Sequence, residues 1–486
     1  MEVKDLQPAL VFQIFDEITK VPRPSKKEGK IRQYLLDFAA RHNIAVKTDK
    51  VGNIVMSKPA TPGHENAPTV IMQGHMDMVC ESNDKSFDFE NNPIKTIVEG
   101  EWVRADGTTL GADNGIGVAA SLAALIDPDL VHGPLEVLVT VDEETGMTGA
   151  FGLEPGMITG KMLLNLDSED DAEIFVGCAG GVDTNCIFHY HRSQAPTDFQ
   201  YFRIDVANGL GGHSGGDIHL GRANANRLIA RFLWSLTQKY EVSLAEIDGG
   251  NLRNAIARAA HAVFGVHTSN KEDVRVMLNK YVADIENEYK GLEVNLTIEM
   301  ESTDIPEFCV DAETSLNVIR ALYCAPHGVI SMSRELEGLV ETSTNLAAVK
   351  MKPDNQILVT TSQRSSVESR KWDIAYMVEA VFQLAGAEVI HGEGYPGWQP
   401  NLESPIMKIA SEAYEELYGI KPAIKAIHAG LECGLFKSVY PDLDMVSFGP
   451  TLRNVHSPSE KMHIPAVDRF WHQLRRVLEK VADLKA

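Results

Sequence analysis

Short apolar runs alternate along this chain with longer segments in which apolar residues recur every three or four positions. Runs of this kind are typical of buried strands, and the three-to-four spacing is typical of helices that cover them. Strand-like runs lie at 52–56, 69–72, 135–141 and 162–166, and helix-like segments at 10–18, 27–41, 115–126 and 467–481. The alternation predicts an α/β architecture with strands buried on both faces.

The middle of the chain carries its own set of elements. A polar, proline-bearing stretch at 193–198 indicates a crossing between domains. The elements expected after it lie at 202–206, 222–238, 274–289, 292–298, 316–323, 345–351, 356–361 and 374–384. We therefore expect an α+β domain, residues 187–390, inserted into a discontinuous domain of residues 1–186 and 391–486. The length of 486 residues agrees, because it exceeds what one hydrophobic core supports.

The composition limits the classes of partner. With 45 basic and 68 acidic residues the formal net charge is -23, which argues against a nucleic-acid or anionic-membrane partner. No apolar run approaches the length of a membrane span, and residues 1–17 do not resemble a signal peptide. The six cysteines are dispersed without a CxxC pair, which is typical of reduced thiols, so we expect a cytoplasmic protein.

Five side chains of metal-binding type stand at or near the ends of apolar runs. They are His75, Asp113, Glu144, Asp167 and His456. Any one of them alone is more often structural than a ligand. In an open α/β sheet, however, ligands collect at the carboxyl ends of strands, and four of the five lie where an apolar run gives way to glycine or acidic residues. Two imidazoles and three carboxylates suit a pair of zinc-like divalent ions.

The neighbour of one expected ligand suggests the chemistry. Two ions roughly 3.5–4 Å apart repel each other, so a carboxylate must bridge them. Such ions lower the pKa of water, and a nearby carboxylate can then take its proton and pass it to a leaving amine. Glu143, beside Glu144, is the candidate for this role. The residues therefore predict a hydrolase that uses two metals.

Three motifs around these residues resemble those of a known family, the zinc-dependent exopeptidases that include carboxypeptidase G, peptidase T, acetylornithine deacetylase and the carnosinases. Gly74-His-Met-Asp77 resembles the family's first-ligand motif, Gly111-Ala-Asp-Asn-Gly115 its bridging-aspartate motif, and Asp142-Glu-Glu-Thr-Gly146 its catalytic pair. Segments 209–216 and 428–434 are similar to the bacterial dipeptidases of this family. The resemblance implies a mixed-sheet α/β catalytic domain with an inserted α+β domain that acts as a lid and in dimerisation.

The resemblance also implies how two Zn²⁺ ions would be held. Asp113 would bridge them, His75 and Asp167 would complete one site, and Glu144 and His456 would complete the other. Cobalt and manganese are possible substitutes, because imidazole and carboxylate ligands accept them as well.

Further positions near the ligands take their roles from the same resemblance. Glu143 would be the general acid and base. Asp77 would hold the far nitrogen of the His75 ring and so determine its tautomer. The family also implies a cis peptide bond between Asp113 and Asn114.

Five more residues are expected to contact the substrate or the developing charge. His213, in a glycine-rich loop, would stabilise the tetrahedral intermediate from the same or a partner subunit, unless it is only a histidine in a flexible turn. Asn254 and Arg364 resemble substrate-contacting positions; Arg364 would grip a terminal carboxylate, with a surface salt bridge as the alternative. His428 and Glu432 would line the substrate pocket without binding metal.

The function that the resemblance implies is the hydrolysis of unblocked dipeptides, including Xaa-His dipeptides and β-Ala-His, by a homodimer. An alternative within the family is an N-acyl amino-acid amidohydrolase, whose substrate has no free amine. A hypothesis of another class is a scaffold without activity that uses the lid only for association. The presence of Glu143 and of all five expected ligands argues against the scaffold.

Overall fold

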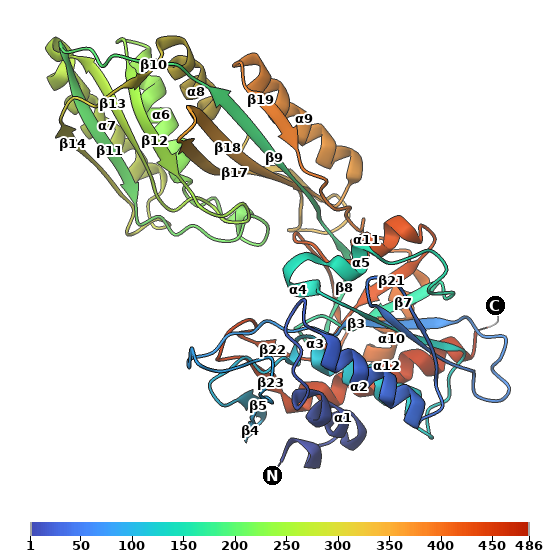
Figure 1. Cartoon of the computed structure of the whole chain (residues 1–486). Coiled ribbons are helices and arrows are strands. Elements are labelled where there is room, and N and C mark those ends of the chain that lie inside the picture. The colour runs from blue at the N-terminus through green and yellow to red at the C-terminus, as the bar shows by residue number, and fades with distance from the viewer. Residues whose placement is uncertain (1, 485–486) are drawn as a thin grey trace. The chain divides into compact units, whose positions relative to one another are not determined.

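The structure is a computed structural model that describes residues 2–484 and divides into two compact units (Figure 1). Unit 1 comprises Met1–Cys178, Trp398–Ala426 and Leu431–Ala486, and unit 2 comprises Ala179–Gly397 and Ile427–Gly430. The expected boundaries at 186 and 391 fall inside unit 2, because the first and last strands of its sheet reach across them.

Unit 1 is built on an eight-stranded mixed sheet. In order across the sheet its strands are β1 (Ala45–Thr48), β2 (Ile54–Lys58), β6 (Leu135–Thr140), β3 (Val70–His75), β7 (Met162–Asn165), β21 (Asp444–Ser447), β8 (Glu173–Cys178) and β20 (Ala423–Ile427). The central strands β6, β3, β7 and β21 run parallel, whereas β2 and β8 beside them are antiparallel. Every residue of β3 and β6 is buried, as expected for apolar strands covered on both faces.

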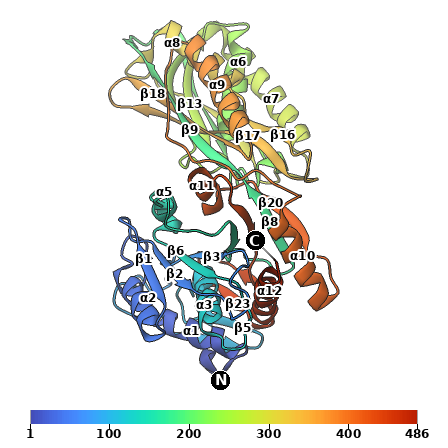
Figure 2. The same cartoon turned by 90° about the vertical axis from the view of Figure 1, so that its right-hand side faces the viewer.

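Long helices surround this sheet (Figures 1 and 2). They are α1 (Ala9–Thr19), α2 (Gly29–Arg41), α3 (Ala112–Ile126), α10 (Pro405–Tyr418) and α12 (Ile464–Ala482). The small residues of α3 allow it to approach the strands closely, since a Cβ atom on Gly117 would lie 2.3 Å from the carbonyl oxygen of Leu166. The apolar stripe of α12 is buried from Val467 to Val481, which confirms its predicted place in the core.

Shorter elements complete unit 1. Three short helices, α4 (Glu143–Gly146), α5 (Thr148–Phe151) and α11 (Glu432–Val439), follow the sheet strands, and the 3-10 helix η1 (Val3–Asp5) precedes α1. A separate four-stranded sheet has the order β22 (Leu452–Arg453), β23 (Lys461–His463), β5 (Trp102–Ala105) and β4 (Thr96–Glu99). The loop between β22 and β23 contains His456, whose φ of 61° lies in the left-handed region.

Unit 2 contains the same arrangement of six elements twice. The first set is β11 (Phe199–Ala207), α6 (Ala225–Thr237), β12 (Ser243–Gly249), β13 (Ala260–His267), α7 (Lys271–Glu288) and β14 (Thr297–Thr303). The second is β9 (Gly180–His189), α8 (Ala312–Cys324), β17 (Val340–Lys352), β18 (Gln356–Ser365), α9 (Glu368–Leu384) and β19 (Glu388–His391). The first set is inserted between β9 and α8 of the second.

The two sets form one nine-stranded antiparallel sheet. Its order is β14-β11-β13-β12-β17-β18-β9-β19, so the second half repeats the order of the first in reverse. The halves meet where β12 pairs with β17, at Asp248↔Lys350 and Gly249↔Val349. The ninth strand, β16 (Gly328–Met332), pairs with β17, and the short strands β10 (Arg192–Ser193) and β15 (Cys309–Val310) pair with each other.

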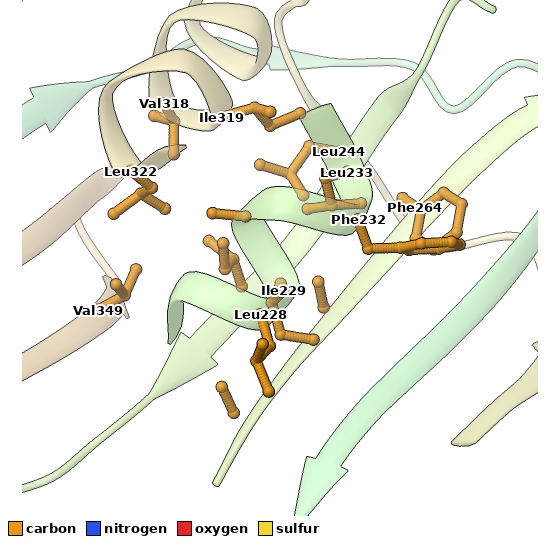
Figure 3. Packing of buried hydrophobic residues seen from close by; sticks show 14 of the residues in the cluster. Leu228, Ile229, Phe232, Leu233, Leu244, Phe264, Val318, Ile319, Leu322 and Val349 are labelled. Carbon is orange, nitrogen blue, oxygen red and sulfur yellow. The ribbon is translucent and has the colours of Figure 1, made fainter. Parts of the chain in front are cut away.

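The helices α7, α6, α8 and α9 pack side by side in one layer on the sheet of unit 2 (Figure 2). Figure 3 shows how α6 buries Leu228, Ile229, Phe232 and Leu233 among residues of β12, β13, β17 and α8. The helix predicted from 222 begins at Ala225, because the side chain of Asn224 accepts the backbone N–H of Arg227 and caps it.

One predicted strand is wrong. The alternating residues 292–296 form turns, and β14 begins only at Thr297. The reason is Glu293, whose buried carboxylate accepts the backbone N–H groups of Leu210 and Ala223 at 2.8 and 2.9 Å and so draws this segment inward. None of the described helices combines the length and apolar character needed to cross a membrane.

Candidate metal centre

The fold of unit 1 brings the five expected ligands together. His75 is the last residue of β3, Asp167 follows β7, and Glu144 lies in α4 just after β6. Parallel strands end at the same edge of a sheet, so these three positions meet there because of the topology. Asp113 joins them from the start of α3, and His456 from the loop between β22 and β23.

The Asp113 carboxylate lies between the two imidazoles. Its Oδ1 is 3.0 Å from His75 Nε2, and its Oδ2 is 3.1 Å from His456 Nε2. Asp167 Oδ1 lies 3.5 Å from His75 Nε2, and Glu144 Oε2 lies 3.0 Å from His456 Nε2. The cluster thus has two halves, each with one imidazole and one private carboxylate, on either side of a shared carboxylate.

The chemistry of this cluster fits divalent cations. Glu144 Oε1 and Asp167 Oδ1 are buried without a hydrogen-bond partner, which is costly for carboxylate oxygens. Burial raises the pKa of Asp167 well above its usual range. The positive charge of His75 opposes this rise, and the negative charge of Asp113 adds to it. Three possible ligand atoms, one from each of His75, Asp113 and Glu144, lie within 4.8 Å of one another. Cations among these atoms would satisfy the oxygens and favour their ionised form.

Asp77 connects His75 with the helix that contains Glu144. Its Oδ1 lies 3.3 Å from His75 Nδ1 and accepts the backbone N–H of Glu143 at 3.0 Å. Its Oδ2 accepts the Ser25 hydroxyl at 2.7 Å and the Glu144 N–H at 3.3 Å. Although burial raises the pKa of Asp77, hydrogen bonds from His75, Ser25 and Glu143 lower it to about 2. An ionised Asp77 can therefore hold the far side of the His75 ring.

Glu143 lies beside the cluster as a half-buried carboxyl group. Burial raises its pKa to about 8 against the opposing charge of His75, and the carboxylates of Glu432 and Glu144 add to the rise. Cations at the neighbouring ligands would favour its ionised form. A carboxyl group whose proton affinity is raised by its surroundings is suited to accept and return a proton.

Glu432 contacts the strands that end at the ligands. Gln73 of β3 and Thr140 of β6 donate hydrogen bonds to its Oε2 at 2.6 and 2.9 Å, and its Oε1 is buried without a partner. Burial raises its pKa to about 7. Its expected contact with substrate remains a prediction. The next residue, Cys433, is fully buried and its thiol pKa is raised, as expected for an incidental thiol.

Glu460 is a residue of the site that sequence reasoning missed. Its carboxylate accepts four backbone N–H groups at 2.7, 2.9, 2.8 and 3.4 Å, those of Leu110, Gly111, Ala112 and Asp113. Glu460 is only four residues after His456 in the sequence. Because its side chain binds the loop 110–113, it links the segment that supplies His456 with the segment that supplies Asp113. Spacing alone does not distinguish such a glutamate from a solvated one.

Arg23 is the second residue that was missed. Its side chain is buried, and its Nη1 donates to the carbonyl oxygens of Met76 at 3.2 Å and Asp77 at 2.8 Å. Its Nη2 donates to the carbonyl oxygen of Gly111. Arg23 therefore joins the end of β3 to the loop before Asp113. The peptide bond after Asp113 is cis, as expected.

In unit 2, His213 lies on the glycine-rich loop near His428. The backbone N–H groups of Gly215 and Gly216 donate to His213 Nδ1 at 3.1 and 3.0 Å, so its proton is on Nε2. A Cβ atom on Gly215 would lie 2.1 Å from the carbonyl oxygen of His428, so the loop approaches this segment closely. The His428 Nε2 is 2.7 Å from the Ser343 hydroxyl.

Arg364 and Asn254 lie in the same unit. Arg364 is only 7% exposed and donates to the Tyr395 hydroxyl at 2.9 Å, and among the described residues it has no ion-pair partner. The alternative of a surface salt bridge is therefore wrong. Burial and the charge of Arg364 lower the pKa of His213, which keeps that ring neutral. Asn254 is exposed, and its backbone carbonyl oxygen accepts the backbone N–H of Ser214 at 2.8 Å.

Comparison with known proteins agrees with this geometry. The model of Peptidase family M20/M25/M40 matches residues 71–480. The chain belongs to this peptidase family. M20 peptidases are metal-dependent, and the cluster around His75 and Asp113 is the candidate metal site.

Two relatives of this M20 peptidase match along its whole length. The cytosol non-specific dipeptidase of Escherichia coli is 42% identical over 481 residues, which are 99% of each chain. The crystal structure of the aminoacylhistidine dipeptidase from Vibrio alginolyticus is 43% identical, with a TM-score of 0.93 over 99% of this chain and 98% of that one. The aminopeptidase PepT from Bacillus cereus is 16% identical with a TM-score of 0.59 over 98% of this chain and all of that one, and shares the fold.

Proposed function

We propose that this M20 peptidase is a cytoplasmic, zinc-dependent dipeptidase that hydrolyses unblocked dipeptides, including Xaa-His dipeptides and β-Ala-His. The observation that carries the proposal is the Asp113 carboxylate, with one oxygen 3.0 Å from His75 and the other 3.1 Å from His456. The substrate class is supported by the names of the two full-length relatives, a cytosol non-specific dipeptidase and an aminoacylhistidine dipeptidase.

Two Zn²⁺ ions per subunit would occupy the two halves of the cluster. Asp113 would bridge them, with His75 and Asp167 on one side and Glu144 and His456 on the other. When bound, the ions polarise the scissile carbonyl group and make water more acidic. Co²⁺ or Mn²⁺ are possible substitutes, since the ligands are imidazoles and carboxylates.

The chain's own residues perform the proton transfers. Glu143 accepts a proton from the attacking water as the new C–O bond forms, and returns a proton to the amine nitrogen as the C–N bond breaks. Asp77 holds His75 Nδ1, so that the Nε2 atom of this ring faces the cluster.

Residues of unit 2 are proposed to bind the rest of the substrate. The Nε2–H of neutral His213 would donate a hydrogen bond to the developing oxyanion, within its own subunit or across to the partner. Arg364 would bind the C-terminal carboxylate bidentately, since its guanidinium is buried and has no carboxylate partner among the described residues. Asn254 and His428 of this unit, and Glu432 of unit 1, are proposed to contact the substrate.

The decisive experiment measures histidine released from β-Ala-His by zinc-loaded protein. A panel of dipeptides and their N-acetylated forms is tested in parallel, with Glu143→Ala as the inactive control. Preferential cleavage of unblocked dipeptides is expected. Preference for the acetylated forms would indicate an amidohydrolase instead, and a rate that Glu143→Ala leaves unchanged would indicate a scaffold with a contaminating activity.

We also propose that unit 2 forms a homodimer contact. The helix α9 exposes Tyr376, Met377 and Leu384, which are 55%, 48% and 90% accessible. Because β12 and β17 already pair with each other in the middle of the sheet, the contact is placed on this helix instead. Light scattering should give twice the mass of one chain, and Met377→Glu with Leu384→Glu should shift it toward one chain. A wild-type mass of a single chain would exclude the dimer.

A further inference from the structure

Unit 2 contains a cavity of about 140 Å³ that the proposed function does not use. Among its lining side chains are three arginines, two tyrosines and a histidine: Arg222, Arg227, Arg231, Tyr289, Tyr323 and His327. They come from residues 222–231, before and within α6, from the residue just after α7, and from residues 323–327 at and after the end of α8. Of the described residues, no aspartate or glutamate lines the cavity, although the whole chain has a formal charge of -23.

The positive charge of Arg227 is not balanced by the protein. Arg231 forms two hydrogen bonds with Glu288, both of 2.7 Å, which neutralise its guanidinium. Among the described residues, the guanidinium of Arg227 donates only to the carbonyl oxygen of Ala325, at 2.9 Å, and no carboxylate lies within 4.0 Å of it. A half-buried guanidinium without a counterion is an unfavourable arrangement that a bound anion would relieve.

His327 adds a neutral hydrogen-bond donor to this lining. The backbone N–H of Leu346 donates to its Nδ1 at 3.2 Å, so the ring carries its proton on Nε2. Burial and the charge of Arg227 lower its pKa to about 3, which keeps the ring neutral at physiological pH. With the guanidinium and tyrosine hydroxyl groups, the cavity therefore presents mainly donors.

We propose that this arginine cavity binds a small oxyanion of the size of phosphate. A cavity of about 140 Å³ is smaller than the roughly 300–1,000 Å³ typical of organic ligands, so a single small anion fits it better than a dipeptide does. Guanidinium groups bind oxyanions through paired N–H donors, and the charge of Arg227 favours an anion over a neutral ligand.

The arginine cavity is connected to the glycine-rich loop. Arg222 donates to the carbonyl oxygen of Gly211 at 2.7 Å and lies 3.5 Å from Asp217. Asp217 in turn accepts the backbone N–H of His213 at 2.8 Å. An anion that binds Arg222 therefore contacts a side chain that anchors this loop, and its binding is expected to slow the opening of residues 209–217.

The test is a titration of the full-length, zinc-loaded protein, freed of excess zinc, with inorganic phosphate. Sodium chloride of equal ionic strength is the reference, and calorimetry gives the affinity. Arg227→Gln is expected to weaken the cavity's phosphate binding by about ten-fold or more, because a charge-assisted hydrogen bond is lost. Arg320→Gln, an equal charge change at an exposed position of α8, is the matched control and should bind as the wild type does. Equal affinities in all three proteins would overturn the proposal.

Hydrogen exchange locates the anion without any substitution. Phosphate should slow exchange of backbone amides at 222–231 and 323–328, and in the loop 209–217, relative to chloride. Protection confined to the strand ends around His75 would show that phosphate binds only at the metal centre and would refute the cavity site. Parallel titrations with sulfate and acetate distinguish a tetrahedral oxyanion from a carboxylate as the preferred ligand, while no protection by any of the three anions would refute the site.

Discussion

Replacing Glu460 by glutamine is expected to weaken zinc binding although Glu460 is not itself a ligand. Each carboxylate oxygen accepts two backbone N–H groups of the loop 110–113. In glutamine one oxygen becomes an NH₂ donor, so two N–H groups lose their acceptor and face a donor. At about 1.5 kcal/mol or more for each bond to a charged group, the loop loses roughly 3 kcal/mol of stabilisation.

The loss should appear in metal affinity, because the loop positions Asp113 between the two imidazoles. Removing a partner behind a metal ligand typically weakens metal binding by about 10–100-fold. Zinc affinity is measured by competition with a chromophoric chelator, and urea unfolding of the metal-free proteins gives the stability change. Glu337→Gln, at an exposed position, controls for the loss of one negative charge. Wild-type zinc affinity in Glu460→Gln would refute the anchoring role.

The remaining predictions concern single side chains. Glu143→Ala should retain its metals and lose about 10²–10⁴-fold in kcat, whereas Asp113→Ala should lose both; full metal occupancy without Asp113 would exclude bridging. Arg364→Gln should raise KM for dipeptides far more than it lowers kcat, and leave KM for dipeptide amides unchanged. His428 has a pKa of about 3 when folded and 6.5 ordinarily, so the unfolded chain binds the extra proton and stability falls as the pH drops from 6.5 toward 3. Urea unfolding measures the free energy of unfolding near pH 7 and at pH 5. The decrease between the two should be about 2 kcal/mol smaller in His428→Gln than in wild type.

Much of unit 1 could be predicted because burial leaves a signal in the residue pattern. The apolar runs 69–72, 135–141 and 162–166 form β3, β6 and β7, since strands covered on both faces are apolar at nearly every position. Parallel strands end at one edge, so the polar side chains that follow these runs converge there. The meeting of His75, Glu144 and Asp167 therefore follows from local pattern and topology.

The features that could not be predicted depend on contacts between segments distant in the sequence, which no local pattern encodes. Residues 292–298 alternate as a strand would, yet Glu293 accepts backbone N–H groups from residues about 70 and 83 positions away, and this contact prevails. Glu460 and Arg23 escaped prediction for the same reason, because their partners are backbone groups of remote loops. The strands β12 and β13 were also missed, and with them the repetition within unit 2.

That repetition has a consequence for how the chain folds during synthesis. The inserted set, β11 to β14, is contiguous, so its own strand pairs can form as soon as residue 303 leaves the ribosome. By contrast, β9 ends at His189, and the strand that pairs with it along its full length, β18, ends at Ser365. At about 5–20 residues per second, β9 waits on the order of 10–35 s for its partner. During that interval the edges of β9 are unpaired and open to aggregation, and early folding of the inserted set restricts the positions that β9 can reach.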